Sequence, residues 1–542
     1  MQDASFKLEK QGQGALPLID DFINMIGLRR LLEASIGNRR YVDAILLLLK
    51  NILVERNALY AIREWSGQFD PLLVYGGTIG DDVMARALDR IFEADRASLM
   101  TRIVLEAIRQ FGIDVSEIHE DTTSVKVFGA YSHQKAKAVQ LKRGHSKDHR
   151  PDLKQLVYDL SVTRDGAIPV HFKIHDGNRT DDTLHWENWL SLRGMLGRSD
   201  FLYVADSKLC VRETMLKIDR EHGLFVTMVP ATRGEVAEFI QQILSLRVRW
   251  ERVTVKRASR KHSRMDLFEV AQGMYQLSEG FRLFWFRSSE KRRRDMEDRE
   301  SRIEQALDHL RGLDESKRRG PKTEVTLRRK AEKVLDRFGA KKWVQLEIAL
   351  ERVEQFKQKK RGRATADSDY RRVIKWVPKL TAKRDMEAVS ESQAMDGIFP
   401  LATNTKLKPI EVLDAYKYQP KLEKRHSFLK SGLKVAPIFL KKNDRIEGLM
   451  FVYFLAQLVA ALIERQIRAG MKKNDVEELH LLPEERPSKH PTAESLFRIF
   501  SHRERNVLKS KGGDKLQIFN EPLSPVQLQA LKLLGLQPTL YA

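Results

Sequence analysis

Two aspartates lie where the sequence pattern places a carboxylate at the edge of a buried sheet. Asp206 ends the apolar run "FLYVAD", which is typical of a central strand that delivers a polar side chain at its carboxyl end. Ligands of open α/β sheets bind at that edge. In "IHEDTTSVKVFG", strand alternation predicts that Asp121 shares a face with His119 and with side chains expected in the core. A partly buried carboxylate needs a partner, and a divalent cation is a common one.

A third carboxylate, Glu423, is surrounded by positive charge in "AYKYQPKLEKRHSFLK". The neighbouring cations are Lys417, Lys421, Lys424, Arg425 and Lys430. Two oxygen ligands on neighbouring strands and a third on a packing helix would form a site for Mg²⁺ or Mn²⁺, which suits in-line displacement at phosphorus. Each aspartate alone has an ordinary alternative as a turn residue or helix cap. The prediction therefore depends on the three acids acting together.

The composition indicates a polyanionic partner. The chain has 542 residues, with 96 Lys and Arg against 74 Asp and Glu, a formal net charge of +22 and a pI near 9.8. This balance favours nucleic acid over an anionic membrane surface. Cys210 is the single cysteine, so neither an intramolecular disulfide nor a cysteine-rich zinc site can form, and a reducing cytoplasm is expected.

One apolar stretch could be mistaken for a membrane span. Residues 448–463 are almost entirely apolar, but charged residues lie close on both sides. A membrane span needs about 20 apolar residues, so we predict a buried core helix and no membrane partner. The beginning, "MQDASFKLEKQGQG", lacks the pattern of a secretory signal.

The texture of the sequence predicts a multi-domain α/β protein. Helical periodicity dominates the first segment, and strand and helix patterns alternate in the second. The third segment is highly charged, the fourth again has the apolar runs typical of a core, and the last is polar. The predicted segments are an all-α domain (1–112), the first part of a mixed-sheet core (113–231), an α+β insertion (232–392), the second part of the core (393–483) and a helical C-terminal region that could be an arm (484–542).

Several individual elements are predicted within these segments. "SEIHEDTTSVKVFG" and "FLYVAD" are typical of strands, and a hairpin is expected to turn at residues 164–166. The insertion should contain a long charged helix over about 289–312 and strands at "FRLFWFR" and "YRRVIKWVPK". Its four tryptophans, Trp250, Trp285, Trp343 and Trp376, are more often core residues than base-stacking surfaces, and the alternative that one of them stacks on a base stays open.

The spacing around Glu423 has a possible helical explanation. Tyr416 and Lys430 lie seven residues before and after it, which is nearly two helical turns. In a continuous helix the three side chains would share one face, with the carboxylate toward the metal and the flanking cations toward DNA phosphates. Pro420 leaves two alternatives, a helix that starts near Gln419 or a kink in a longer helix.

These motifs resemble those of bacterial insertion-sequence transposases with an RNase H-like core, an Asp-Asp-Glu triad and a large insertion before the Glu. The intervals here are 85 residues from Asp121 to Asp206 and 217 from Asp206 to Glu423. The family signature Tyr-Arg-Glu-Lys is matched at Tyr416, Glu423 and Lys430, with Gln419 in place of the Arg. The resemblance extends over about 115–465 and includes "GHSKDHRPDLKQLVYDL", "HDGNRTDDT", "VADSKL", "DGIFPLATN" and "RIEGLMFVYFLAQLVAALIERQ".

The resemblance implies a function for each of these residues. Asp121, Asp206 and Glu423 would hold two Mg²⁺ (or Mn²⁺) ions, and Tyr416, Gln419 and Lys430 would position the scissile strand. Gln cannot form the bidentate, charge-assisted contact that Arg makes with phosphate. The two histidines of "GHSKDHR" are four residues apart and could form a metal-binding pair on a helix. The stretch is basic, contains Gly and has no helical periodicity, so we expect instead a DNA-facing loop with His145, Lys147 and Arg150.

The implied activity is cleavage of DNA at the ends of a mobile element and joining of the freed 3′-hydroxyl to target double-stranded DNA. The N-terminal helices would bind the terminal repeats, and a homodimer would hold two ends together, with the C-terminal region as a plausible interface. The alternatives are an RNase H-like metal-dependent nuclease that cuts without joining, and a DNA-binding protein that has lost catalysis.

Overall fold

The computed structural model describes most of the chain. The described residues are 6–131, 134–144, 150–179, 184–245, 247–259, 262–315, 323–359, 362–363, 368–438, 440–482, 484, 486–510, 512 and 514–542. They form two compact units. Unit 1 comprises residues 1–227, 403–406 and 411–542, and unit 2 comprises 228–402 and 407–410. The five-part division expected from the sequence is finer than these two units and stays a prediction.

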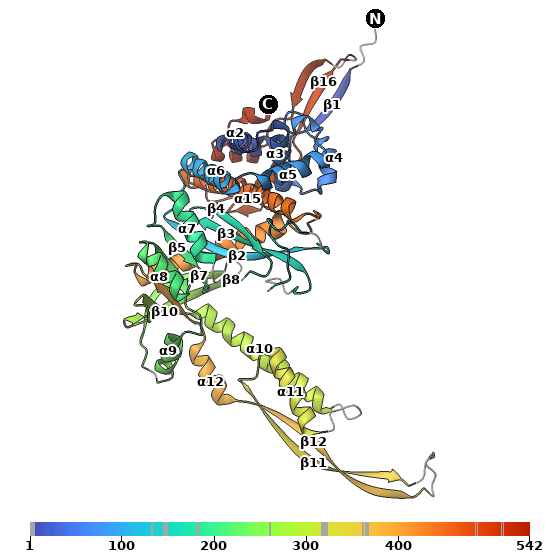
Figure 1. Cartoon of the computed structure of the whole chain (residues 1–542), viewed down its shortest axis with the longest axis vertical. Helices are drawn as coiled ribbons and strands as arrows, with labels where there is room; N and C mark the ends of the chain where they lie inside the picture. Colours follow the sequence, from blue (N-terminus) through green and yellow to red (C-terminus); the bar gives the residue numbers. More distant parts are fainter. Residues whose placement is uncertain are drawn as a thin grey trace. The chain divides into compact units, whose positions relative to one another are not determined.

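A mixed sheet forms the centre of unit 1 (Figure 1). Its strand order among the described residues is β4-β3-β2-β5-β6. β3 runs antiparallel to β2 and β4, whereas β2, β5 and β6 are parallel. The turn between β3 and β4 contains Gly166, whose φ of 83° suits a residue without a side chain, so the predicted hairpin is confirmed. The strands are β2 (Glu117–Val127), β3 (Lys154–Thr163), β4 (Pro169–Asp176), β5 (Leu202–Ala205) and β6 (Leu224–Met228).

Helices from both ends of the chain surround α15 (Asn443–Lys473) in unit 1. By length and composition alone α15 could cross a membrane, but its apolar window is completely buried in the structure. This confirms the predicted core helix. Its helical neighbours are α1 (Leu16–Met25), α3 (Arg39–Val54), α5 (Asp81–Glu93), α16 (Ala493–Phe500) and α17 (Pro525–Leu534).

The remaining elements of unit 1 complete its outer layers. A small antiparallel sheet joins the two ends of the chain in the order β1-β16-β17, namely β1 (Lys7–Gly12), β16 (Glu504–Lys509) and β17 (Lys515–Asn520). The other helices are α2 (Leu28–Ile36), α4 (Ile62–Ser66), α6 (Arg96–Phe111), α7 (Leu184–Leu196), α8 (Arg212–Arg220) and α14 (Gln419–Ser427).

Unit 2 has its own strands and an extension that we call the arm, which consists of α10 (Ser289–Glu315), α11 (Glu324–Phe338) and the two-stranded ribbon that follows them, residues 289–384. The strand order is β13-β10-β8-β7, and β9 pairs with β10. These strands are β7 (Trp250–Ser259), β8 (His262–Ala271), β9 (Tyr275–Gln276), β10 (Arg282–Ser288) and β13 (Ile398–Thr403). The other helices are α9 (Gly234–Leu244) and α12 (Met386–Met395), and α13 (Pro409–Tyr416) begins at the boundary of the units.

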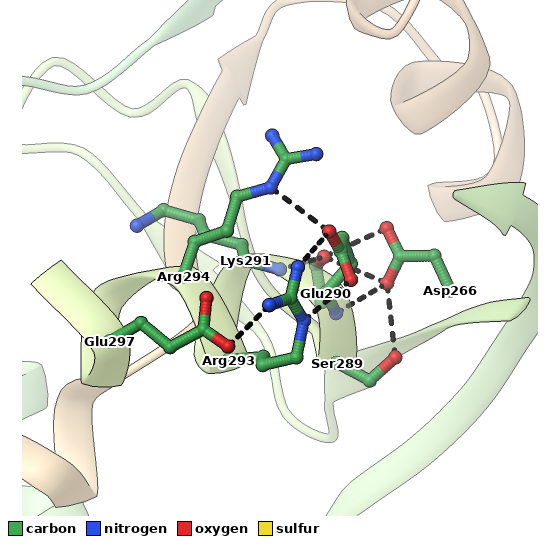
Figure 2. Close-up of polar contacts among 8 residues, drawn as sticks. Asp266, Ser289, Glu290, Lys291, Arg293, Arg294 and Glu297 are labelled. Atoms are coloured by element: carbon green, nitrogen blue, oxygen red, sulfur yellow. Dashed lines mark hydrogen bonds and ion pairs between the residues drawn. The ribbon is translucent and has the colours of Figure 1, made fainter. Parts of the chain in front are cut away.

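The charged helix predicted at 289–312 is confirmed as α10, which continues directly from β10. Figure 2 shows how its first turn is fixed. Asp266 of β8 accepts hydrogen bonds from the Glu290 N–H (3.0 Å) and the Ser289 hydroxyl (3.1 Å). Glu290 in turn pairs with Arg293 (2.7 Å) and Arg294 (3.0 Å). Acceptors and negative charge stabilise a helix N-terminus, so the start of the arm is held firmly.

A separate hydrophobic core stabilises the arm. Its buried residues are Ile303, Ala306 and Leu310 of α10, Leu327, Ala331 and Leu335 of α11, and Ala340, Val344, Leu380 and Val389. The helical members recur at three- and four-residue intervals, so each helix buries one face. Val344 and Leu380 belong to a two-stranded ribbon of β11 (Val344–Gln358) and β12 (Tyr370–Arg384).

Candidate active site

Asp121 and Asp206 share one edge of the sheet in unit 1. β2 and β5 are parallel, with His119 opposite Val204. Extending this register by two residues brings Asp121 beside Asp206, which directly follows β5. Neighbouring strands lie about 4.8 Å apart. The two side chains are 26% and 43% exposed, so both are accessible to a ligand.

Asp206 also stabilises the turn that follows β5. Its Oδ1 accepts a hydrogen bond from the Lys208 N–H at 2.8 Å. Its backbone carbonyl accepts one from the Thr227 hydroxyl at 2.6 Å. This is the turn role that a single Asp after a strand commonly plays. A carboxylate has about four acceptor positions, so the turn contact is compatible with binding a ligand as well.

A buried polar cluster of Glu120, His185 and Tyr203 lies next to Asp206. The sequence did not predict it. Glu120 lies on the other face of β2 from Asp121, and its Oε2 is 2.6 Å from Nδ1 of His185 on α7. Nε2 of the same His185 is 3.8 Å from Oδ1 of Asp206. The Tyr203 hydroxyl donates to Glu120 at 3.3 Å. Glu120 and His185 are thus a buried support for Asp206.

The buried groups of this cluster shift one another's pKa values. Burial raises the pKa of Glu120 well above its usual value, and the charge of Asp159 adds to this. Burial would also raise the pKa of Asp159, but hydrogen bonds from His175 and Glu120 outweigh it and lower that pKa. Burial opposes protonation of His185, yet the nearby carboxyl groups of Glu120 and Asp206 raise its pKa to about 10. His185 is therefore a cation at neutral pH.

Glu423 lies on α14, which packs against β2. Leu422 and His426 of this helix are buried, whereas Glu423 is exposed. Nε2 of His426 is 3.7 Å from Oδ2 of Asp121. The same helix therefore carries Glu423 and contacts the strand of Asp121.

The charges of the three carboxylates all affect the phenol of Tyr416. Burial raises the pKa of its phenol to about 12, and the charges of Asp206, Glu423 and Asp121 each contribute to the increase. Negative charge raises the pKa of a phenol only when it is close. The three acids, separated by 85 and 217 residues in the sequence, thus all act on the phenol of Tyr416, which stays protonated near neutral pH.

The continuous helix that would put Tyr416, Glu423 and Lys430 on one face does not form, and the other alternative, a helix that starts near Gln419, is confirmed. α13 ends at Tyr416 and α14 begins at Gln419, with Pro420 in its first turn. Tyr416 and Glu423 therefore lie on different helices, and Lys430 lies in a widened π-helical turn, Phe428–Gly432. Pro420 lacks the N–H that a helix interior would need, which favours a new helix start over a kink.

The expectation that all the cations around Glu423 face phosphates is also wrong for Arg425. Its side chain is only 6% exposed and forms a 2.9 Å ion pair with Glu464. It also donates to the carbonyls of Ala167 (2.9 Å) and Gly166 (3.0 Å). Arg425 thus ties α14 to the β3–β4 turn and to α15.

The other predicted DNA-binding residues have different environments. Nε2 of Gln419 is buried at the start of α14 and has no hydrogen-bond partner among the described residues. Arg150 is half-exposed and forms two hydrogen bonds of 2.8 and 2.7 Å with Asp152. His145 and Lys147 lie outside the described residues.

The chemistry of the three carboxylates fits a hard divalent cation, because carboxylate oxygens are preferred ligands of Mg²⁺ and Mn²⁺. Within the described parts of the chain, however, no group of three or more His, Cys, Asp or Glu side chains is close enough to hold a metal ion together. The metal site remains a prediction that rests on Asp121, Asp206 and the exposed Glu423.

Comparisons with known proteins leave the family open. No family model matches the chain, and no curated protein matches it. Among solved structures, the chain is similar to the piggyBac transposase in a cryo-EM synaptic complex with hairpin DNA. The sequence identity is 11% and the TM-score 0.26, over 51% of this chain and 59% of that chain. So remote a likeness carries no argument, and the case for function depends on the site itself.

Proposed function

We propose that the protein is a DNA transposase that binds the ends of its element, cleaves DNA there and joins the 3′-hydroxyl ends to target DNA. The observation that carries the proposal is the parallel register that brings Asp121 beside Asp206, together with the packing of α14, which bears Glu423, against β2. Phosphoryl transfer needs carboxylate-held metal ions and donors for a phosphate, and both residue types occur here. The net charge of +22 favours a DNA substrate, and the single cysteine is compatible with the reducing cytoplasm that we propose as its location.

The strand order of unit 1 supports an RNase H-like core. Counted along the chain from β2, the order is 3-2-1-4-5, and only the second strand runs opposite to the others. That is the arrangement of an RNase H-like sheet. Asp121 lies on its first strand and Asp206 directly after its fourth, where such a core would carry two acidic residues.

The proposed roles follow from these positions. Asp121, Asp206 and Glu423 would hold two Mg²⁺ or Mn²⁺ ions, which would activate the nucleophile and stabilise the leaving oxygen. Tyr416 donates a hydrogen bond to a phosphate oxygen because its phenol stays protonated. Nε2 of Gln419 supplies a second, neutral donor, and Lys430 supplies charge to the scissile strand.

A cleavage and joining assay tests the proposal. The substrate is a DNA fragment with the chain's own gene and the flanking DNA on both sides, incubated with the full chain and Mg²⁺. Joined products support the transposase. Cleavage without joining supports the RNase H-like nuclease instead, and salt-sensitive binding with neither product supports a catalytically inactive DNA-binding protein.

We further propose that two copies pair through β17, since two DNA ends must be held together. Among the described residues β17 pairs only with β16, so its other edge is open. Leu516, Ile518 and Phe519 are 52%, 48% and 43% exposed. An exposed apolar edge strand is a template for pairing with another chain. The same strand of a second copy, run antiparallel, offers an identical edge.

Ile518→Lys is expected to weaken this dimer at least tenfold, because a lysine on an edge strand opposes strand pairing. Sedimentation velocity over a range of protein concentrations measures the dissociation constant. Leu528→Lys is the matched control, since Leu528 is 42% exposed on α17, outside the sheet. A wild-type chain that stays monomeric with and without DNA would contradict the proposed dimer.

A further inference from the structure

The β11–β12 ribbon of unit 2 has one face that is only half covered. The strands pair from Val344↔Arg384 to Gln358↔Tyr370, so the even-numbered residues of both strands share a face. Near the helices this face belongs to the core of the arm, through residues such as Val344, Ile348 and Leu380. Farther out it is exposed: Leu350 by 55%, Phe356 by 66%, Tyr370 by 49%, Ile374 by 46% and Trp376 by 62%.

Trp376 is unusual among the tryptophans of the chain. All seven lie within the described residues, and Trp376 is the one that is exposed. Trp285, for comparison, is buried and stacks on Phe239 at 3.9 Å between ring centroids. A large aromatic ring left in water is costly unless it is covered when the protein functions.

The exposed part of this face alternates apolar and polar groups across the ribbon. Trp376 lies opposite Arg352, Ile374 opposite Glu354, Phe356 opposite Arg372 and Tyr370 opposite Gln358. Arg, Gln and Glu side chains hydrogen-bond to base edges in DNA, and apolar side chains contact thymine methyl groups or insert between base steps. Glu354 contacts Arg352 at 3.1 Å and also Arg372, and such exposed pairs are exchanged at little cost.

The charge of the ribbon specifies the kind of partner. Residues 344–384 include 12 Lys and Arg against five Asp and Glu, a net charge of +7. The odd-numbered face carries Lys357, Arg371, Lys375, Lys379 and Lys383. A second identical ribbon would be repelled by this charge, and the cores of protein interfaces are poor in lysine. Phosphates, in contrast, would be attracted.

We propose that the outer half of the ribbon, from Leu350 to Gln358 and from Tyr370 to Pro378, lies in a groove of duplex DNA. The even face contacts the bases, and the flanking cations contact phosphates. The major groove is about 12 Å wide and admits a two-stranded ribbon. The inference rests on the proposed function for its substrate class, but it places a DNA contact in unit 2 that does not depend on the carboxylates of unit 1.

Hydrogen bonds and ion pairs fix α10, the helix that carries the ribbon's supporting core. The first turn of α10 is fixed by Asp266 and by the Glu290–Arg293 pair (Figure 2). Farther along, Arg299 forms a buried two-pronged ion pair with Asp396, with both contacts at 2.7 Å. A rigidly held binding element loses less conformational entropy when it binds.

The experiment measures binding of a fluorescein-labelled duplex by the full chain at several salt concentrations. Trp376→Ala is expected to weaken binding roughly tenfold, as for the loss of an aromatic contact with a base. Arg371→Glu/Lys375→Glu should weaken it more, and the slope of log affinity against log salt should fall by about one for each lost phosphate contact. All three side chains are exposed, so thermal unfolding should be unchanged.

Arg329→Glu/Lys330→Glu is the matched control. It makes the same change of charge on α11, at two exposed positions of the same unit, and should leave duplex affinity close to that of the wild type. Trp376→Phe keeps an aromatic ring and should recover most of the affinity that Trp376→Ala loses. Equal losses in the α11 control would mean that the ribbon binds DNA only through net charge and would overturn the groove contact.

Two further outcomes overturn the inference. In one, Trp376→Ala abolishes self-association of the chain without changing duplex affinity, so the face docks on a second copy. In the other, neither property changes. Failure of the proposed function is separate, because it would appear as no joined product with any variant, whereas each outcome that overturns this inference is a result on duplex affinity or self-association and leaves joining by the wild type intact.

Discussion

Glu423→Gln is expected to lower the rate of DNA cleavage by about 10²- to 10³-fold, the range found when one group that stabilises transition-state charge is removed. Gln has the shape of Glu but lacks the negative charge that a metal ligand supplies. Because Glu423 is exposed, the change should leave the thermal unfolding of the chain within experimental error. Single-turnover cleavage with saturating DNA and Mg²⁺ measures the effect.

Glu411→Gln is the matched control, because it makes the same chemical change at an exposed position of α13 and should keep the wild-type rate. Unchanged cleavage in Glu423→Gln would show that Glu423 is not a ligand. Metal binding also has a readout other than activity. Mg²⁺ should raise the melting temperature of the wild type by mass action, and Asp121→Asn/Asp206→Asn should lose that increase.

The elements that hold the two aspartates were accessible from sequence because their signals are local. The apolar run before Asp206 and the alternation around Asp121 each specify a strand, and the turn residues 164–166 specify the hairpin. What the pattern cannot specify is the neighbour of a strand. The approach of Asp121 and Asp206 follows from the parallel pairing of β2 with β5, which depends on the whole sheet.

The features that the sequence left open or did not reveal are those that depend on distant partners. Pro420 is compatible with a helix start and with a kink, and only the structure shows the break after Tyr416. Glu120 and Asp121 are adjacent in β2 and point to opposite faces of the sheet. No local pattern indicates that His185 of α7 contacts Glu120. β11 was not predicted, since "VQLEIALERVEQFKQ" is rich in helix-favouring residues. Its strand form depends on pairing with β12 along its entire length.

Arg425→Ala tests the most consequential of these corrections. The change leaves Glu464, 8% exposed, without its buried partner and removes the donors to the carbonyls of Gly166 and Ala167. Breaking a buried ion pair from one side costs about 3–5 kcal/mol. We expect a loss of that size in the free energy of unfolding of unit 1, measured by chemical denaturation.

Lys424→Ala is the comparison that distinguishes the structural role of Arg425 from a phosphate contact. Lys424 is exposed, so Lys424→Ala should change the stability by no more than about 0.5 kcal/mol while reducing the affinity for DNA. Adding Glu464→Gln to Arg425→Ala should recover part of the lost stability, because it removes a buried charge whose remaining ionic partner is Arg468 at 3.5 Å. If Arg425→Ala instead weakens DNA binding at unchanged stability, the guanidinium serves the phosphates after all, and α14 is anchored by its other contacts, such as the hydrogen bond from Gln457 to the Arg425 carbonyl.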